Sequence, residues 1–465
     1  MCALSVDRPV DSSVVHPCSE YETVVEPAPK LWRRLVSSGG GDAGRLADVA
    51  RSFRREIGLN ATGPVIASGH QAGFWHPGIV AKYAAVQGAQ AFGASAWLVA
   101  DLDANAPTQV RLPRRGADGV VRVEVVELAG DGAGHPDAPT GLRAPVAVAD
   151  GLPSELARVG QALSRARVGA SSLAAQVHGA VSDLLEQAGC GQPGETVYAS
   201  AICRTNLFAA AIEEMERDPA RCVESYNAAV AACPDAGVRT LAADRDQGRW
   251  ELPVWGIGFN EPRTPVVIDQ GVSLDASVLA PRGLLMTGLM RLAGCDLFIH
   301  GTGGGVYDTI TERWLRDWLG VTLAPSAVVS ATLRLDLGFG AMTPDDAQKQ
   351  IALGHRARHG PDLLADPDRA RAKRELVDRI EALERGDPAR RVLFAQMHAL
   401  LKQARDSGSE QLRALDKQVE LARGVLRSRE AVTDRTWSFA LHEEAAIEQL
   451  CAFVRGAIEA MPSRG

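Results

Sequence analysis

The sequence PVIASGHQAGFWHPGIVAKYAAVQGAQAFGASAWLVAD, residues 64–101, decides the predicted fold. Residues 64–69 are a short apolar run that ends in glycine, which is typical of a buried strand. Residues 77–92 are predicted to form a helix, because proline is favoured at the first helical position and Gly93 provides a stop. Residues 95–101 have the composition of a second buried strand. A strand, a crossover helix and a strand make a βαβ unit, which implies a parallel sheet.

A similar strand, glycine-rich loop and helix are predicted later in the chain. Residues 295–300 form an apolar run, the loop GTGGG occupies 301–305, and residues 306–319 have helical spacing. Further helices are expected at 42–57, 152–190, 205–217 and 282–294, and further strands at 255–259 and 265–269. Strands that alternate with helices predict an α/β core with a Rossmann-like parallel sheet.

The C-terminal part of the sequence has a different character, because glycine and proline become sparse after residue 365. Leu376 and Ile380, like Leu393 and Met397, are spaced by four residues and predict an apolar seam along helices. We therefore expect a C-terminal helical hairpin or antiparallel coiled coil, through which two copies would form a homodimer. The predicted parts are an α/β core with both glycine loops at 1–360, the coiled-coil hairpin at 361–432, and a C-terminal helix that docks on the core at 433–465.

Composition bounds the class of protein. A length of 465 residues suggests two or three domains, and a net charge of −7 argues against a general nucleic-acid binder. The sequence has no apolar run long enough for a membrane span and no signal-peptide pattern at its start. The eight cysteines include no Cys-x-x-Cys pair, so neither a zinc cage nor a disulfide framework is predicted. We expect a cytoplasmic protein that binds a small-molecule substrate.

The loop SGHQAGFWHPG at 68–78 is the first candidate small-molecule site. Gly69 and Gly73 would let the backbone approach a ligand, and Gly78 would let the start of the helix pack closely. The helix N-terminus at Pro77 would present free N–H groups and partial positive charge, which favours a phosphate or a carboxylate. Ligands of open α/β sheets bind at the carboxyl ends of the strands, where this loop falls.

Four polar side chains accompany this loop. His70 and His76 are the loop side chains that could exchange protons near neutral pH. Lys82 lies one turn beyond the helix start and could supply a fixed charge, and Gln71 is a further candidate binding residue. The alternative interpretation is a tight turn in which the histidines cap the helix or face solvent.

Two aspartates follow the second strand and should lie beside this loop. The carboxylates of Asp101 and Asp103 could hold a metal, a ribose or an amine. The alternative is that they cap a turn or a helix, and one of them could be functional without the other.

The second glycine loop follows His300. Three successive glycines, with Gly303 and Gly304 as candidate binding residues, would form a backbone nest for an anion. Tyr307 and Asp308 are placed in the first turn of the next helix, where an acid offsets the dipole. The alternative is a flexible connection between strand and helix.

Three other residues are functional candidates by their chemistry. Cys203 follows a strand-like run, and an inert buried thiol is the favoured interpretation over a nucleophile. His355 and His359 are spaced as metal ligands can be, but the sequence nearby supplies no third ligand. We therefore assign no metal site.

Residues 66–105 resemble the first core motif of the bacillithiol-synthesis cysteine-adding enzymes, the cysteine ligase family. That motif contains a strand, Thr-Gly-Gln-Gln with a glycine and Gly-Pro-Leu, a helix with a lysine, and a Trp-bearing strand that ends in an acidic cluster. It is matched here by Ser68, Gly69, His70, Gln71, Gly73, Pro77, Gly78, Lys82, Trp97, Asp101 and Asp103. A second resemblance covers 279–323, with Gly303, Gly304 and Tyr307. His70 in place of the family's glutamine, and Leu102 in place of its histidine, are departures.

The resemblance implies a ligase-type enzyme that joins an amine or an amino acid such as cysteine to a small anionic substrate. His70 and His76 would then stabilise or protonate the reacting group, and Asp101 or Asp103 would hold the amine. The turn at 303–305 would bind the anion or a nucleotide, with ATP as the candidate cofactor. Two alternatives stay open, namely a nucleotide- or sugar-nucleotide-dependent transferase and a non-catalytic coiled-coil scaffold with a ligand-sensing core.

Overall fold

The structure is a computed structural model that describes residues 21–37, 39–60, 62–130, 132, 134–269 and 272–459. The chain divides into two compact units. The first contains residues up to 110, residues 125–334 and residues from 435 onward, and the second contains residues 111–124 and 335–434. The described part of the chain begins with a strand at residues 21–26.

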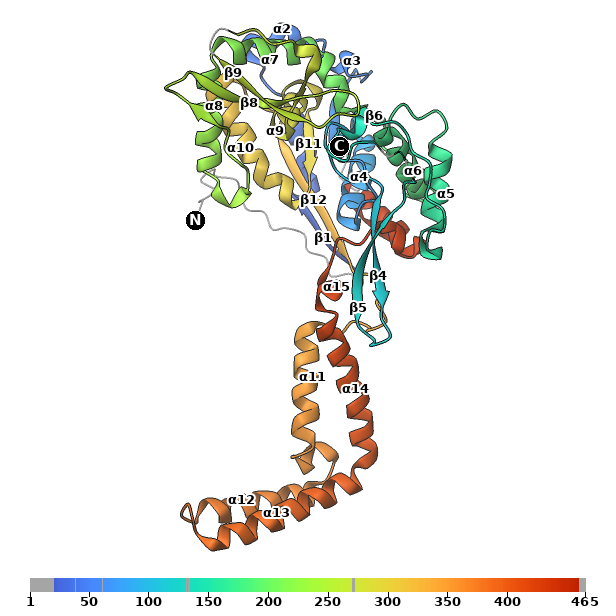
Figure 1. Cartoon of the computed structure of the whole chain (residues 1–465), viewed down its shortest axis with the longest axis vertical. Helices are drawn as coiled ribbons and strands as arrows, with labels where there is room; N and C mark the ends of the chain where they lie inside the picture. Colours follow the sequence, from blue (N-terminus) through green and yellow to red (C-terminus); the bar gives the residue numbers. More distant parts are fainter. Residues whose placement is uncertain are drawn as a thin grey trace. The chain divides into compact units, whose positions relative to one another are not determined.

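A six-stranded sheet forms the centre of the first unit (Figure 1). Its order is β1-β12-β11-β2-β3-β6, and all neighbours are parallel except β1, which pairs with β12 in the antiparallel sense. The expectation of an α/β core with a mainly parallel sheet is thereby confirmed. The strands are β1 (Tyr21–Glu26), β2 (Val65–His70), β3 (Ala94–Val99), β6 (Glu195–Tyr198), β11 (Leu297–His300) and β12 (Ser326–Leu333).

The two predicted strand-to-helix connections leave neighbouring strands at the centre of this sheet. The first connection is the chain at residues 68–78, and the second connection is the chain at residues 300–305. From β2 the chain passes through α4 (Pro77–Gly88) to β3, and from β11 it passes through α10 (Thr302–Leu319) to β12. These two crossovers run in opposite directions along the sheet. Because such crossovers are right-handed, α4 and α10 cover opposite faces (Figure 1).

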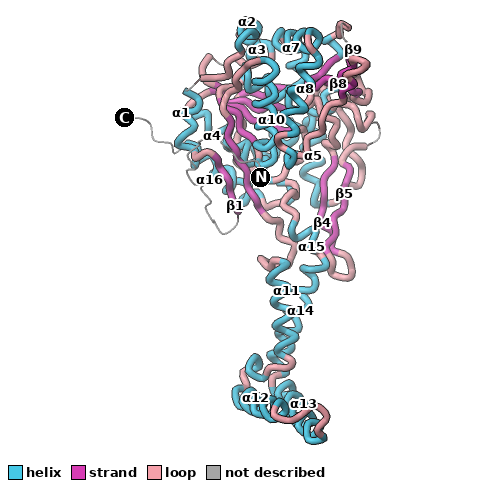
Figure 2. Tube along the Cα trace, turned by 90° about the vertical axis from the view of Figure 1, so that its left-hand side faces the viewer, coloured by secondary structure: helices cyan, strands magenta, loops and turns pink. Residues whose placement is uncertain are grey.

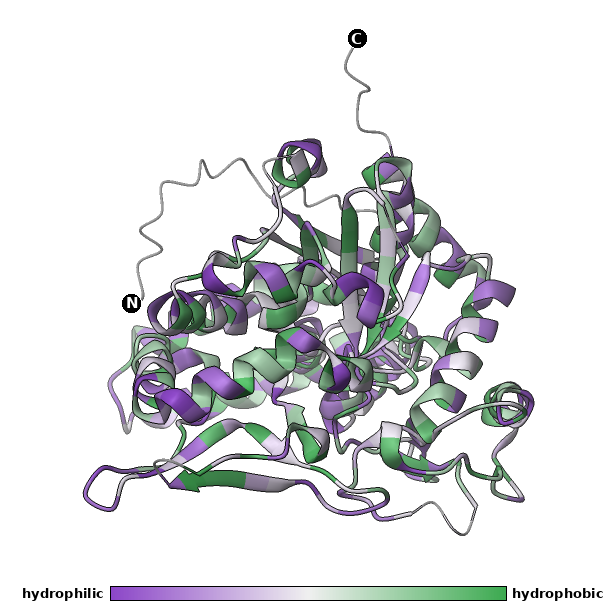
Figure 3. Ribbon diagram, turned by 90° about the horizontal axis from the view of Figure 1, so that it is seen from above, coloured by the Kyte–Doolittle hydropathy of each residue, from purple (hydrophilic) through white to green (hydrophobic). Residues whose placement is uncertain are grey.

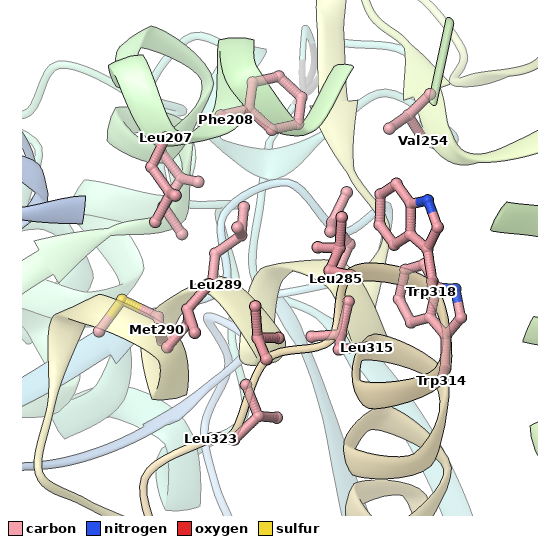
Figure 4. Packing of buried hydrophobic residues seen from close by; sticks show 14 of the residues in the cluster. Leu207, Phe208, Val254, Leu285, Leu289, Met290, Trp314, Leu315, Trp318 and Leu323 are labelled. Carbon is pink, nitrogen blue, oxygen red and sulfur yellow. The ribbon is translucent and has the colours of Figure 1, made fainter. Parts of the chain in front are cut away.

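The face covered by α10 holds the main hydrophobic core. Val65 and Ala67 of β2 contribute to it, and Trp314 and Trp318 of α10 stack with ring centroids 5.4 Å apart (Figure 4). A spacing of four residues places both indoles on one side of the helix. The colours of Figure 3 show the same pattern, with apolar strands between helices of mixed polarity.

A second, antiparallel sheet packs against this core. Its central strand β8 (Arg249–Gly256) pairs with β7 (Ala243–Asp244), β9 (Thr264–Asp269) and β10 (Leu279–Pro281). The predicted strand at 255–259 is therefore wrong beyond Gly256. Residues 257–263 form a loop, in which Asn260 takes a left-handed backbone conformation with φ 57°.

The remaining helices of the first unit surround these sheets. The C-terminal helix packs on α4, as predicted, and Gly88 lets the two backbones approach closely. A disulfide joins Cys190 to Cys451 of this helix, which the cysteine spacing did not predict. The helices are α1 (Trp32–Ser37), α2 (Ala47–Ala50), α3 (Phe53–Glu56), α5 (Ala157–Ala166), α6 (Leu173–Gln187), α7 (Asn206–Arg217), α8 (Pro219–Ala231), α9 (Gly283–Leu289) and α16 (Glu444–Glu459).

The second unit consists mainly of paired helices (Figure 2). α12 packs against α13 through the predicted seam of Leu376, Ile380 and Leu393. α11 packs against α14, where Gly354 meets Val419, so this unit begins earlier than the predicted residue 361. The helices are α11 (Pro344–Ala357), α12 (Pro367–Glu381), α13 (Pro388–Ser407), α14 (Ser409–Arg427) and α15 (Arg429–Thr433), and the hairpin of β4 (Gln109–Arg115) and β5 (Val121–Glu127) supplies residues 111–124.

The described part of the chain contains no helix that is both long and apolar enough to cross a membrane.

Candidate functional site

The glycines of the first connection serve mainly to pack the chain. A Cβ on Gly69 would lie 2.4 Å from Leu98 O and 2.7 Å from Leu98 Cβ, so only glycine fits there. A Cβ on Gly78 would lie 2.9 Å from Ser330 Oγ. Gly73 has nothing within 4 Å, so it is the one glycine of the three that leaves open space.

The N-terminus of α4 does not offer the free N–H groups that we predicted. Pro77 has no N–H, the N–H of Gly78 donates to His76 Nδ1 at 3.1 Å, and the N–H of Ile79 donates to His76 O at 2.9 Å. His76 is therefore a helix cap, which is the alternative interpretation of this histidine. The positive end of this helix is closed to an anion by its own cap.

Lys82 lies between the two connections. Its side chain is buried, and a Cβ on Gly301 of the second connection would lie 3.9 Å from Lys82 Cδ. Among the described residues, its amine makes one hydrogen bond, which it donates to Gly69 O at 2.7 Å. Burial lowers the pKa of Lys82 to about 7.

The surroundings of His70 differ from those expected of a group that exchanges protons near neutral pH. Its Nδ1 lies 3.3 Å from Gln71 O, and its ring meets Trp75 edge to face. Burial, followed by the charge of Lys82, lowers the pKa of His70 to about 3. The imidazole is therefore neutral at physiological pH and can exchange hydrogen bonds, but it cannot act as a cationic acid.

Asp103 lies beside the first connection, as expected. Gln71 Nε2 donates to Asp103 Oδ2 at 2.8 Å, and Arg263 Nη1 donates to Asp103 Oδ1 at 3.1 Å. Arg263 is distant in sequence and was not predicted. This half-buried carboxylate thus joins the glycine loop to the loop between β8 and β9.

Asp101 has a different environment, in which both oxygens are used. Ser200 donates its N–H to Oδ1 at 2.8 Å and its hydroxyl to Oδ2 at 2.6 Å. A Cβ on Gly141 would lie 2.3 Å from Oδ2, so the carboxylate is also covered on that side. Burial raises the pKa of Asp101 to about 6, and hydrogen bonds from Ser200 oppose this change. This geometry favours a structural role for Asp101, in which it links the ends of β3 and β6, over contact with a substrate.

The second connection is helical where a loop was expected. α10 begins at Thr302, so Gly303 and Gly304 lie in its first turn and do not form a separate nest. Gly301 is the N-cap, and no side chain caps this helix within the described residues. Gly303 is exposed with nothing within 4 Å of its Cβ position. The first two residues of α10, Thr302 and Gly303, are therefore exposed beside the central strands, as an anion site at a helix start requires.

A buried charged cluster supports the start of α10. Asp308 lies in the second turn, not the first as predicted, and its Oδ2 is 2.6 Å from Arg291 Nη1 and 3.1 Å from His300 Nε2. Glu312 contacts the other guanidinium nitrogen at 2.6 Å. Burial would raise the pKa of Asp308, but His300 and the charge of Arg291 lower it to about 2. Arg291 was missed because its role depends on tertiary packing. Tyr307 is exposed at the surface of the same turn.

Other sequence candidates lie apart from this site. Burial raises the pKa of Cys203 to about 12, which makes it an unreactive thiol. His355 on α11 and His359 in the turn after this helix are both exposed, with ring centroids 5.2 Å apart. The described residues include no group of three side chains suited to hold a metal ion.

A pocket of about 490 Å³ lies at the opposite, amino edge of the sheet. It is lined by residues 40–43, by α2 and by the segment before β11, and its Arg54 and Asp296 pair with each other at 2.8 Å. None of the predicted site residues borders this pocket, so the carboxyl edge remains the candidate site.

No protein-family model and no curated protein sequence matches the chain.

Proposed function

We propose that this protein is an enzyme that joins an amine or an amino acid to a small anionic molecule at the carboxyl edge of its parallel sheet, between β2 and β11. The observation that carries the proposal is Lys82, a buried amine with a pKa of about 7 that lies between the two connections. A buried lysine with no paired carboxylate is costly for the fold, and such groups cluster at functional sites.

The arrangement of strands supports this location. Taken in chain order, the five parallel strands follow the 3-2-1-4-5 order of a Rossmann-like sheet. In such sheets ligands bind where the crossovers diverge to opposite faces, which here is the boundary between β2 and β11. A nucleotide such as ATP is therefore the candidate cofactor, and it also fits the alternative of a nucleotide-dependent transferase.

The residues at this edge divide the chemical work. The uncapped start of α10 would hold the anionic group of one reactant, because its N–H groups and dipole favour negative charge. Neutral Lys82 would accept the proton that an incoming ammonium group must lose before it attacks. Neutral His70 would orient a reactant by hydrogen bonding, and Asp103 would meet the amine beside Gln71.

The resemblance of residues 66–105 and 279–323 to the bacillithiol-synthesis cysteine-adding enzymes supports cysteine as one reactant. The α12–α13 pair supports the further proposal of a homodimer formed through this hairpin. Crosslinking that persists unchanged when Leu393 and Met397 are replaced would contradict that dimer.

A reaction screen tests the proposed function. The protein would be incubated with cysteine, ATP and a panel of amino-sugar malates or sugar nucleotides, and new products would be detected by mass spectrometry. We expect Lys82→Met to lower the rate by roughly 100-fold or more, as loss of a general base does. Lys349→Met is the matched control, because Lys349 is exposed on α11.

Two results would contradict the proposal. Product formation by Lys82→Met at the wild-type rate would remove Lys82 from the chemistry. A product that requires a sugar nucleotide and excludes free amino acids would favour the transferase.

A further inference from the structure

Two arginines stack on one tryptophan near the end of β8, the central strand of the antiparallel sheet. The guanidinium carbon of Arg282 lies 3.9 Å from the centroid of the Trp255 ring, and that of Arg263 lies 4.9 Å from it. The register of β8 explains this placement, because Trp255 is paired with Pro265 on one side and with Ala280 on the other. Each arginine is two residues from a strand partner of Trp255.

Arg282 is held in place by hydrogen bonds to β8. Its Nε donates to Val254 O at 3.1 Å, and its Nη2 pairs with Glu251 at 2.9 Å. Burial opposes ionisation of Glu251, but hydrogen bonds from Ala242 N, Arg239 and Arg282 lower its pKa below the usual value. A charged Glu251 therefore fixes the Arg282 guanidinium, and Trp255 orients its plane.

Arg263 connects this pair to the first connection. It donates to Leu102 O and to Asp103 Oδ1, both at 3.1 Å. The side chain of Arg263 is 21 % exposed and that of Arg282 is 13 % exposed, so both keep some contact with solvent. Arg239 also pairs with Glu251. Among the described contacts, three guanidinium groups therefore pair with only two carboxylates, those of Glu251 and Asp103.

We propose that Arg263 and Arg282, held on Trp255, form a subsite for a compact dianion, a molecule with two negative ends such as a diphosphate or a dicarboxylate. The guanidinium group binds carboxylate and phosphate through paired N–H donors, and two guanidinium groups on one ring suit a ligand with two such ends. This inference rests on the proposed function in one respect, because the dianion would be its anionic reactant.

Isothermal titration with inorganic pyrophosphate and with succinate tests the subsite, and acetate is the singly charged comparison. We expect either dianion to bind at least tenfold more tightly than acetate. Arg263→Gln and Arg282→Gln should each weaken that binding at least tenfold. Arg282→Lys should not restore it, because lysine lacks the planar fork. Arg249→Gln is the matched control. Arg249 lies in β8, the strand that contains Trp255, and it forms an exposed pair with Asp269.

The outcomes separate this subsite from the proposed function. Binding that survives Lys82→Met and His70→Ala but fails in Arg263→Gln supports the subsite, even if no product is found in the reaction screen. Binding lost in Lys82→Met and unchanged in both arginine variants would overturn it, as would the absence of binding to the wild-type protein. Because Arg282 is largely buried, circular dichroism must first show that its variants fold, and Arg263→Gln decides the matter if they do not.

Discussion

In the connection from β2 to α4, glycine lets strands and helix pack, whereas in the connection from β11 to α10 it leaves backbone open to solvent. Gly69 presses on Leu98, and His76 caps the helix that follows. Gly301 caps α10 without a side chain, and Gly303 has free space around it. The same strand, glycine and helix pattern therefore serves packing in one place and an open helix start in the other.

This difference teaches that glycine content alone does not identify an anion site. What matters is whether the N–H groups of the following helix are already bonded. In the first connection they are bonded, and the group available for chemistry there is the buried amine of Lys82, which donates a hydrogen bond to Gly69 O. In the second they are open, and a buried cluster around Arg291 stabilises the turn beneath them.

The largest expected effect concerns Lys82 in the first connection. The unfolded chain keeps its lysine proton up to a pH of about 10.5 and the folded chain only up to about 7, so the unfolded state binds more protons in this interval. The free energy of unfolding should therefore rise from pH 7 to pH 10.5, by up to roughly 5 kcal/mol. Lys82→Met should be more stable than wild type at pH 7 and lack this rise.

Urea unfolding at pH 7 and pH 9.5 measures this difference, with Lys349→Met as the control that keeps the wild-type slope. A variant and a wild type with parallel pH profiles would show that Lys82 is charged in the fold.

The next effect is in the second connection. Asp308→Ala should lower the free energy of unfolding by about 3–5 kcal/mol, because Arg291 would remain buried without its main partner. Asp317→Ala on the same helix removes only exposed pairs and should change it by less than about 0.5 kcal/mol. Since Asp308 has a pKa of about 2, its contribution should be lost as the pH falls from about 4 toward 2.

Thermal unfolding of both variants gives the comparison. Equal melting temperatures for Asp308→Ala and Asp317→Ala would mean that the buried cluster does not stabilise the start of α10.

A smaller loss is expected from Gly69→Ala. The added methyl group meets Leu98 O at 2.4 Å, so the strands must shift, at a cost of about 1–3 kcal/mol. Gly73→Ala in the same loop has free space and should be nearly neutral. Denaturant midpoints of the two variants decide whether the first glycine serves packing, and a neutral Gly69→Ala would refute that role.

The smallest effect is expected from Gly301→Ser, a substitution that gives the second connection a side-chain cap like that of the first. Gly301→Ser adds a capping hydroxyl where the nearest atom to its Cβ is 3.9 Å away, and it should stabilise the fold by a few tenths of a kcal/mol. Gly301→Ala adds bulk without the cap and serves as the control. If the open helix start binds an anion, titration with phosphate should show weaker binding to the serine variant than to the alanine variant.

The sequence was sufficient for the parts of the fold that local signals specify. The runs at 64–69 and 95–101 and the proline at the start of α4 predicted β2, β3 and their crossover. The edge strand β1 was missed because YETVVE is half polar. β12 and α8 were not predicted either, although the sequence carries a signal for each. These signals are the apolar run at 326–333 and the helix start at Asp218–Pro219.

The sequence predicted where the candidate site lies, but not which contacts its residues make. Proximity of Asp103 to Gln71 follows from the parallel pairing of β2 and β3, and it was predicted for that reason. The sequestration of Asp101 by Ser200 depends on β6 being the next strand, which no local pattern specifies. Arg263 and Arg291 take their roles from contacts across more than a single element, so only the folded chain shows them.

The bond between Cys190 and Cys451 bears on how this protein is handled in the laboratory. It closes a segment of 261 residues and attaches the last helix to the end of α6. In the loop-entropy account, a cross-link over so long a segment stabilises the fold by about 5–6 kcal/mol. Such bonds are rare in reducing cell compartments, so the compartment in which the chain is made decides whether the bond forms. Preparations with and without a reducing agent are therefore two different samples, and their stabilities should not be compared as one.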